Sequence, residues 1–286
     1  MNLEDPIGII ELGNVNLKCL IFQINKNNSS EILSTAITPS EGIHNDVVVN
    51  LTKASNAIRL SIGTAEKKAK ISLKKINVVF EQPDFLCTKF SKHKKIDGSK
   101  IHRHDIEFLL KEAKKQLILN DKNQSIIHIF NHNYIVDGKI FMEEPIDVFA
   151  DSLSHEMTFI TVPKNNLKNI NQVFIDCDIE IERLISHTFT LGVKLLNVRE
   201  LQLGSALINL GYKKISLGLF KNLALVHSVT LPIGTDHITN DISKVCSLNF
   251  KESLEIRNNF DFLFQDNSIL FDENKFLKEK FFFDSN

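Results

Sequence analysis

The sequence has no tryptophan, only two tyrosines, and few glycines, prolines and cysteines among its 286 residues. The four cysteines are far apart and show no paired spacing, which argues against a zinc motif and is typical of a reducing compartment. No apolar run approaches the about eighteen residues that a membrane-spanning helix needs, and the acidic N-terminus is unlike a signal peptide. The 34 basic and 35 acidic residues nearly cancel, so no overall field attracts nucleic acid. We therefore expect a soluble, cytoplasmic protein that does not bind nucleic acid.

Hydrophobic residues make up 43% of the chain, which is enough for one large domain or two of ordinary size. The apolar pattern begins with a hairpin over Ile7–Ile24, which turns at Gly13-Asn14. The polar segment Thr38–Asn50 is predicted to be an exposed connection. The spacing of apolar residues over Leu51–Lys70 then predicts an amphipathic helix.

From about residue 71 to residue 162 the pattern changes to short strands around one helix, which predicts a small α+β unit. Its first strand is expected at Ile76–Phe80 and its helix from about Arg103 to Leu119. The basic segment Lys89–Lys95 has one aromatic residue and is interpreted as a solvated face. Histidines are frequent here, but His128 and His132 are four apart on a predicted strand, about 13 Å along it and too far to share one ion. We therefore expect no metal site.

The segment 163–198 is predicted to return to the larger fold with a helix, a strand and a second helix. The strand is expected at Ile179–Ile185, and Ser186 is expected to cap the helix that follows it. Together with the first hairpin, this segment completes a mixed α/β arrangement.

Three further apolar runs predict a β-meander that leads into a helix. Its strands are expected at Leu203–Leu210, Ile215–Phe220 and Ala224–Leu231. The chain then breaks at Pro232 and Gly234, after which Thr235 or Asp236 is expected to cap a helix. A meander and a capped helix form a unit that can hold an anion at its turns.

The end of this meander resembles the second phosphate-loop region of the FtsA family, bacterial cell-division proteins of the actin/Hsp70 superfamily. Pro232-Ile233-Gly234, Thr239 and Asn240-Asp241-Ile242 repeat the Pro-x-Gly strand end and the Thr-x-Asp-Ile helix of that family. Asp137-Gly138 and Pro145-Ile146 repeat marks of the subdomain that the family inserts. The resemblance spans nearly the whole chain. It implies an α/β, actin-like (ribonuclease H-like) fold with an inserted small α+β (SHS2-like) subdomain and an incomplete second half.

The same resemblance predicts how the chain is divided. Residues 1–70, completed by 163–198, would form the first actin-like subdomain, 71–162 the inserted SHS2-like subdomain, and 199–286 part of the second actin-like subdomain. The Phe-rich segment 260–286 is expected to pack in the core of this last part, with peripheral membrane contact as the alternative.

Both phosphate loops depart from the family pattern. The first loop lacks the hydroxyls and the lysine of Asp-x-Gly-Thr/Ser-Ser-Lys, and the second keeps one glycine of Asp-x-Gly-Gly-Gly-Thr-x-Asp. Glycine loops bind phosphate because their backbone N–H groups approach it closely, and added side chains block that approach. By resemblance, the candidate nucleotide-binding residues are Glu11, Gly13, Asn14, Asn209, Gly211, Lys213, Lys214 and Gly234.

No catalytic residue is expected, because the carboxylates that would hold Mg²⁺ and orient an attacking water are missing from the second loop. Lys213 and Lys214 are expected on a solvated hairpin turn, although as point charges they can attract a phosphate. ATP and Mg²⁺ are therefore expected to bind weakly at most.

The resemblance implies a scaffold that links the FtsZ ring to the membrane and to later division proteins. It also implies self-association and a location at the inner face of the cell membrane at the division site, with only peripheral membrane contact. Two alternatives stay open. One is a nucleotide-binding ATPase or kinase of the superfamily, with Glu11 as the metal-side carboxylate. The other is a pilus-type actin-like adaptor that binds an inner-membrane peptide.

Overall fold

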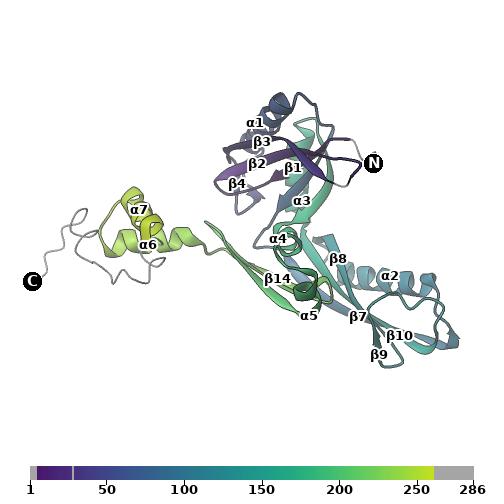
Figure 1. The fold of residues 1–286 in the computed structure, drawn as a ribbon. Helices are drawn as coiled ribbons and strands as arrows, with labels where there is room; N and C mark the ends of the chain where they lie inside the picture. The colour runs from purple at the N-terminus through teal and green to yellow at the C-terminus, as the bar shows by residue number, and fades with distance from the viewer. Residues whose placement is uncertain (1–4, 28, 261–286) are drawn as a thin grey trace, which may run out of the picture. The chain divides into compact units, whose positions relative to one another are not determined.

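The structure is a computed structural model that describes residues 5–27 and 29–260. The chain divides into two compact units, with the boundary between Pro232 and Ile233. Within the described ranges, the first unit contains sheets of five, four and three strands and a two-stranded hairpin, and the second contains two helices (Figure 1).

The five-stranded sheet has the order β11-β6-β1-β2-β3. Its strands are β1 (Ile7–Glu11), β2 (Asn16–Ile24), β3 (Ser30–Pro39), β6 (Lys75–Phe80) and β11 (Glu180–Ser186). The hairpins β1–β2 and β2–β3 are antiparallel, whereas β6 pairs in parallel with both β1 and β11. The carboxyl ends of β1, β6 and β11 therefore meet at one edge of this sheet.

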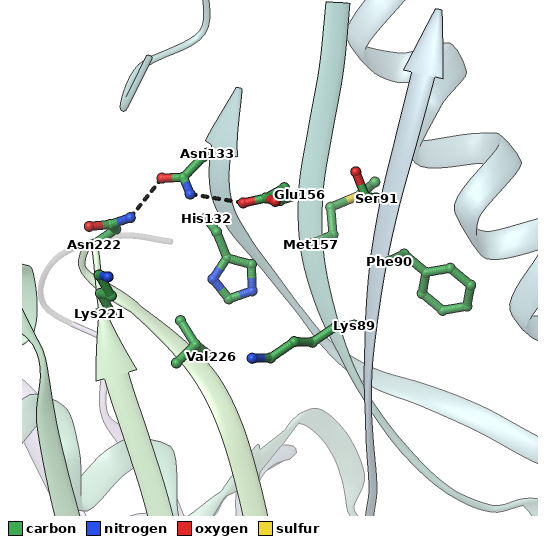
Figure 2. Close-up of a pocket in the computed structure, with 10 residues that line it drawn as sticks. All are labelled: Lys89, Phe90, Ser91, His132, Asn133, Glu156, Met157, Lys221, Asn222 and Val226. Carbon is green, nitrogen blue, oxygen red and sulfur yellow. Dashed lines mark hydrogen bonds between the residues drawn. The ribbon is translucent and has the colours of Figure 1, made fainter. Parts of the chain in front are cut away.

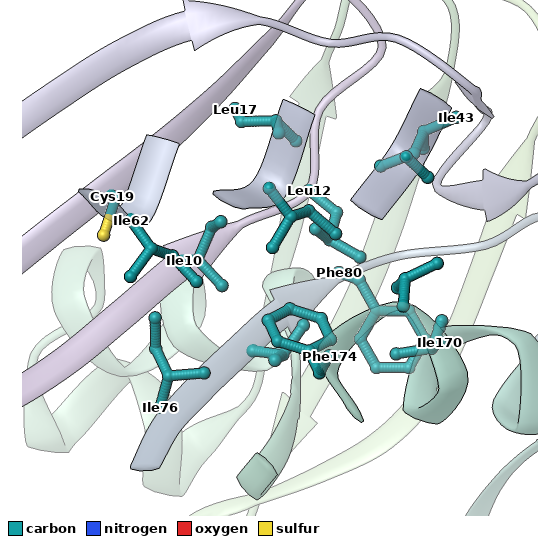
Figure 3. Close-up of a cluster of buried hydrophobic side chains, with 14 of the residues drawn as sticks. Ile10, Leu12, Leu17, Cys19, Ile43, Ile62, Ile76, Phe80, Ile170 and Phe174 are labelled. Carbon is teal, nitrogen blue, oxygen red and sulfur yellow. The ribbon is translucent and has the colours of Figure 1, made fainter. Parts of the chain in front are cut away.

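Two helices pack on the five-stranded sheet and bury the main core. The first, α1 (Leu51–Ala69), contacts β2 and β3, and the second, α3 (Lys164–Ile175), contacts α1 and β11. Figure 3 shows side chains from strands and helices meeting in this core; those labelled include Ile10, Leu17, Ile62, Phe80 and Phe174. Each large apolar side chain buried in this way contributes about 1.5–3 kcal/mol of transfer free energy.

The four-stranded sheet has the order β7-β10-β8-β9 and is antiparallel throughout. Its strands are β7 (Leu86–Lys100), β8 (Gln124–Val136), β9 (Lys139–Phe141) and β10 (Phe149–Pro163). The helix α2 (Arg103–Asn120) lies against this sheet (Figure 1) and buries Ile106, Leu109 and Ala113 there.

The three-stranded sheet is the meander β12-β13-β14. Its strands are β12 (Ser205–Leu210), β13 (Ile215–Lys221) and β14 (Ala224–Leu231), and two short helices, α4 (His187–Leu195) and α5 (Val198–Leu203), contact β13. The two-stranded hairpin consists of β4 (Ile43–His44) and β5 (Val47–Val48). The inserted sheet and the five-stranded sheet are joined where the backbone N–H of Ser186 donates to Nε2 of His128 at 2.9 Å.

The second unit contains α6 (Thr235–Val245) and α7 (Phe250–Phe260), which pack on each other. Arg257 of α7 donates to the Thr235 carbonyl oxygen and to Oγ1 of Thr239, both at 2.9 Å. No helix in the part of the chain that the structure describes combines the length and apolar character needed to cross a membrane.

Most elements agree with the sequence. The first hairpin, the helices α1 and α2 and the meander lie where the apolar pattern predicts them, and Ser186 caps α4 by accepting the N–H of Phe189. From residue 261 onward, the Phe-rich segment lies outside the part of the chain that the structure describes. The predicted boundaries 1–70, 71–162, 163–198 and 199–286 stay a prediction.

Three local predictions are wrong. Ile76–Phe80 does not open the inserted unit, because β6 pairs with β1 and β11 and the inserted sheet begins with β7 at Leu86. The connection 38–50 is not exposed throughout, since its β4–β5 hairpin buries Ile43 and Val48. The helix α6 begins directly after Gly234, which is its N-cap, so neither Thr235 nor Asp236 is the cap.

Two glycines in helices give a matched test of this packing. A Cβ on Gly192 of α4 would lie 2.0 Å from the Phe220 ring of β13, whereas a Cβ on Gly63 of α1 would meet nothing within 4 Å. We expect Gly192→Ala to lower the free energy of unfolding by about 1–3 kcal/mol through overpacking. Gly63→Ala should raise it by about 0.5–1 kcal/mol, because alanine favours the helix. Urea denaturation of both variants measures this difference, and equal effects of the two changes would contradict the close contact of α4 with β13.

Candidate functional site

A cavity of about 430 Å³ lies where the β1–β2 turn and the end of β6 meet the β12–β13 turn. We call it the loop pocket. Its polar lining residues are Glu11, Asn14, Asn16, Lys18, Asp46, His187, Asn209, Tyr212, Lys213 and Lys214, and the glycines Gly13 and Gly211 also line it. The structure thus brings together seven of the eight predicted nucleotide-binding residues. The eighth, Gly234, belongs to the second unit.

The two glycines of the loop pocket are required by the turns in which they lie. A Cβ on Gly13 would lie 2.4 Å from the carbonyl oxygen of Asn16, and a Cβ on Gly211 would lie 2.7 Å from that of Lys214. Both contacts are closer than real Cβ atoms allow. Tight reversal of the chain therefore explains both glycines, so their presence does not by itself indicate a phosphate loop.

Asp46 is buried in the wall of this pocket because of the β4–β5 turn. Asn45 and Asp46 are the two central residues of that turn, with φ of 50° and 57°, a left-handed conformation that Asn and Asp adopt more readily than most residues. The Asp46 side chain is only 2% exposed. Its Oδ2 accepts the backbone N–H of Glu81 at 2.8 Å and the ammonium of Lys214 at 2.5 Å.

Lys214 reaches this carboxylate from the β12–β13 turn. Its side chain is 12% exposed, and its Nζ also donates to the carbonyl oxygen of Glu81 at 2.5 Å. The prediction of a solvated hairpin turn is therefore wrong for Lys214. The sequence of the turn does not reveal that a buried carboxylate 168 positions away faces it.

Glu81, which sequence reasoning missed, is fully buried directly after β6. One of its carboxyl oxygens accepts Oγ–H of Ser186 at 2.7 Å and the backbone N–H of Thr188 at 3.0 Å, and the other accepts Oγ1–H of Thr230 at 3.4 Å. It thus ties β6 to the β11–α4 junction and to β14. The sequence does contain a signal for Glu81. It is a charged residue directly after an apolar strand, and α/β sheets place functional groups at the carboxyl ends of their strands.

Burial shifts the pKa values of two ionisable groups that line the loop pocket, Asp46 and His187. It raises the pKa of Asp46 from 3.8 to about 6, and the nearby Lys214 ammonium only partly opposes this effect. Burial also lowers the pKa of His187, against the attraction of Glu11. The shift at Asp46 means that the desolvation of its carboxylate exceeds the gain from the ion pair, as is common for buried pairs.

Glu11 and Asn14 of the first loop are also engaged within the chain. Glu11 forms an ion pair with Lys18 at 3.2 Å, and Oδ1 of Asn14 accepts the backbone N–H of Asn45. Within the described residues, no group of three His, Cys, Asp or Glu side chains could hold a metal ion. Mg²⁺ requires several oxygen ligands in near-octahedral geometry. This pocket does not fit that requirement, since the ammonium of Lys214 already occupies an oxygen of Asp46.

A second cavity, of about 480 Å³, lies between the inserted sheet and the β13–β14 turn (Figure 2). Asn222 of the turn donates to Asn133 at 2.7 Å, and Asn133 donates to Glu156 at 2.9 Å. The imidazole of His132 hydrogen-bonds Oγ1 of Thr158, and burial lowers its pKa. The bond from Asn222 fastens the meander to the inserted sheet, whereas the other two lie within that sheet.

Comparison with known proteins identifies the inserted sheet. Residues 86–161 match the family model described as the SHS2 domain inserted in FtsA. The FtsA of Agrobacterium fabrum is 22% identical over 261 residues, which cover 88% of this chain and 58% of the relative. That of Buchnera aphidicola subsp. Schizaphis graminum is 25% identical over 248 residues, covering 87% of this chain and 59% of the relative. The chain is FtsA-like. It spans less than two thirds of the length of these relatives.

Solved structures agree with the actin-like fold predicted for this FtsA-like chain. A type IV pilus biogenesis complex of PilM and PilN matches 91% of the chain and 70% of the solved chain, with a TM-score of 0.63 at 10% identity. The ethanolamine utilization protein EutJ of Carboxydothermus hydrogenoformans matches 91% of the chain and 63% of the solved chain, with a TM-score of 0.50 at 9% identity. These likenesses concern the fold alone. The predicted actin-like α/β fold with an SHS2 domain is confirmed.

Titration of Asp46 provides a pH test of the loop pocket in the FtsA-like chain. Since the pKa rises from 3.8 unfolded to about 6 folded, the folded state binds more protons in that interval, and stability falls as the pH rises through it. Relative to Asp46→Asn, the wild type should lose roughly 2–2.5 kcal/mol of unfolding free energy between pH 4 and pH 7. Denaturation at several pH values measures the difference, with the exposed Asp241→Asn as control. Parallel profiles of the wild type and Asp46→Asn would contradict the burial of a charged Asp46.

Proposed function

We propose that this chain acts as a cell-division scaffold of the FtsA type. The likeness to curated proteins named cell division protein FtsA supports this, because it extends over 88% of the chain and includes the inserted SHS2 domain. The chain spans only 58% of that relative, so the activity and partners of the whole protein enter only as part of the proposal.

The scaffold is proposed to work with little or no ATP hydrolysis. The observation that carries this is the ion pair of Lys214 with Asp46, which occupies the wall of the loop pocket where the resemblance would place a phosphate and its metal ion. Lys213 has its ammonium 5.4 Å from the centre of the Tyr212 ring, on the same turn. A phosphate entering the pocket would also meet the carboxylate of Glu11. Repulsion between the phosphate and this carboxylate disfavours phosphate binding, and so does the lack of an open glycine loop.

The proposed partners are FtsZ and later division proteins, with contact at the inner face of the membrane and self-association of the chain. They follow from the resemblance to FtsA. A pull-down of the tagged chain with purified FtsZ, and separately with an inner-membrane peptide of the pilus type, distinguishes the scaffold from the pilus-type adaptor. Capture of FtsZ supports the proposal, whereas capture of the membrane peptide alone contradicts it.

Titration calorimetry with Mg-ATP tests the lack of nucleotide chemistry. We expect no binding heat with the wild-type chain or with Glu11→Ala, because the pocket's carboxylates and ammoniums are already paired. Glu41→Ala, which changes an exposed carboxylate outside the pocket lining, is the matched control. Tight binding that is lost in Glu11→Ala but kept in Glu41→Ala would instead support an ATPase or kinase of the superfamily.

A further inference from the structure

Lys214 connects segments that are far apart in the sequence. From the β12–β13 turn, its ammonium binds Oδ2 of Asp46 on the β4–β5 turn and the carbonyl oxygen of Glu81 after β6, both at 2.5 Å. These partners are 168 and 133 positions away along the chain. One side-chain nitrogen thus holds the meander to two segments that pack with the five-stranded sheet.

The partners of Lys214 are those of a cation site. A carboxylate oxygen and a backbone carbonyl oxygen are the ligand types that hard metal ions take in proteins. An ammonium is a compact charge with three donors, so it satisfies the same oxygens by hydrogen bonds. The Oδ2 of Asp46 that binds Lys214 also accepts the backbone N–H of Glu81 at 2.8 Å.

The buried negative charge of Asp46 makes its contact with Lys214 necessary. A buried carboxylate without a partner costs several kcal/mol. In the described part of the chain, the cation hydrogen-bonded to Asp46 is Lys214, while the nearby Lys18 forms its ion pair with Glu11. The Lys214 side chain is itself nearly buried, so water screens the pair little.

We propose that Lys214 is the built-in cation of the loop pocket, which neutralises Asp46 and holds the β12–β13 turn in place without metal or nucleotide. This inference concerns the pocket of the proposed function and rests on it. The β12–β13 turn is then held in place by the protein's own cation, whether or not a ligand is present.

Hydrogen exchange measured by mass spectrometry tests the proposal in the full chain. The proteins are the wild type, Lys214→Met, Asp46→Asn and the double variant, with Lys213→Met as the control on the same turn. We expect Lys214→Met to speed exchange of segments 40–50 and 209–216 about tenfold or more, because it leaves the Asp46 charge unpaired. Lys213→Met should change exchange by less than about twofold.

The decisive comparison is the same lysine change in the Asp46→Asn background. There, Lys214→Met should have little effect, since no buried charge needs the cation. Equal effects in both backgrounds would overturn the proposal, because they would assign Lys214 to packing alone. If Lys214→Met does not fold, folding of the double variant supports the proposal, and failure of both overturns it.

Mg-ATP added to the wild type separates this inference from the proposed function. Slower exchange of the two segments with Mg-ATP would contradict the lack of nucleotide binding. The coupling between Lys214 and Asp46 is measured without nucleotide, so it stands or fails independently of that result.

Discussion

Parallel pairing of β6 between β1 and β11 is the constraint on which the candidate site depends. It brings three strand ends to one edge of the sheet and thereby places Glu11, Glu81 and Ser186 near one another. Glu81 is fully buried there, so its carboxyl oxygens must receive donors from the protein. The donors come from the β11–α4 junction and from β14, which fixes the meander relative to the sheet. The loop pocket forms where this arrangement brings the β1–β2 turn, the end of β6 and the β12–β13 turn together.

Much of the fold could be predicted because its burial is periodic. In β2, Leu17, Cys19 and Ile21 alternate with more exposed residues, and α1 buries Ala54, Ile58, Ile62 and Ala65 at helical spacing. Such patterns state what kind of element forms but not which element it pairs with. The apolar run 76–80 is buried almost throughout and carries no sign of its partners, so its sheet was assigned wrongly.

The candidate site was predicted by a different kind of information. Resemblance to the FtsA loops selected eight residues, and seven of them meet in one pocket although they come from two distant parts of the sequence. Their actual contacts could not be predicted, because they depend on residues outside the loop patterns. Asp46 lies in a segment that the sequence predicts to be an exposed connection. Only the structure shows that Asp46 is buried and that it forms an ion pair with Lys214. The bonds that matter most here are long-range and polar, and neither periodicity nor local motif encodes them.

The hydrogen bond from the Ser186 backbone to His128 has a consequence for acid conditions. To accept this bond, Nε2 must carry no proton, so the imidazole is neutral with its hydrogen on Nδ1. Burial lowers the pKa of His128 from 6.5 to about 4, so the joint between the inserted sheet and the five-stranded sheet persists well below neutral pH. The unfolded chain, however, takes up a proton at this histidine near pH 6.5, and the stability that the joint contributes declines from there toward pH 4. The bond between the two sheets is thus made by a neutral imidazole, so its contribution to stability changes little above neutral pH and is progressively lost in acid.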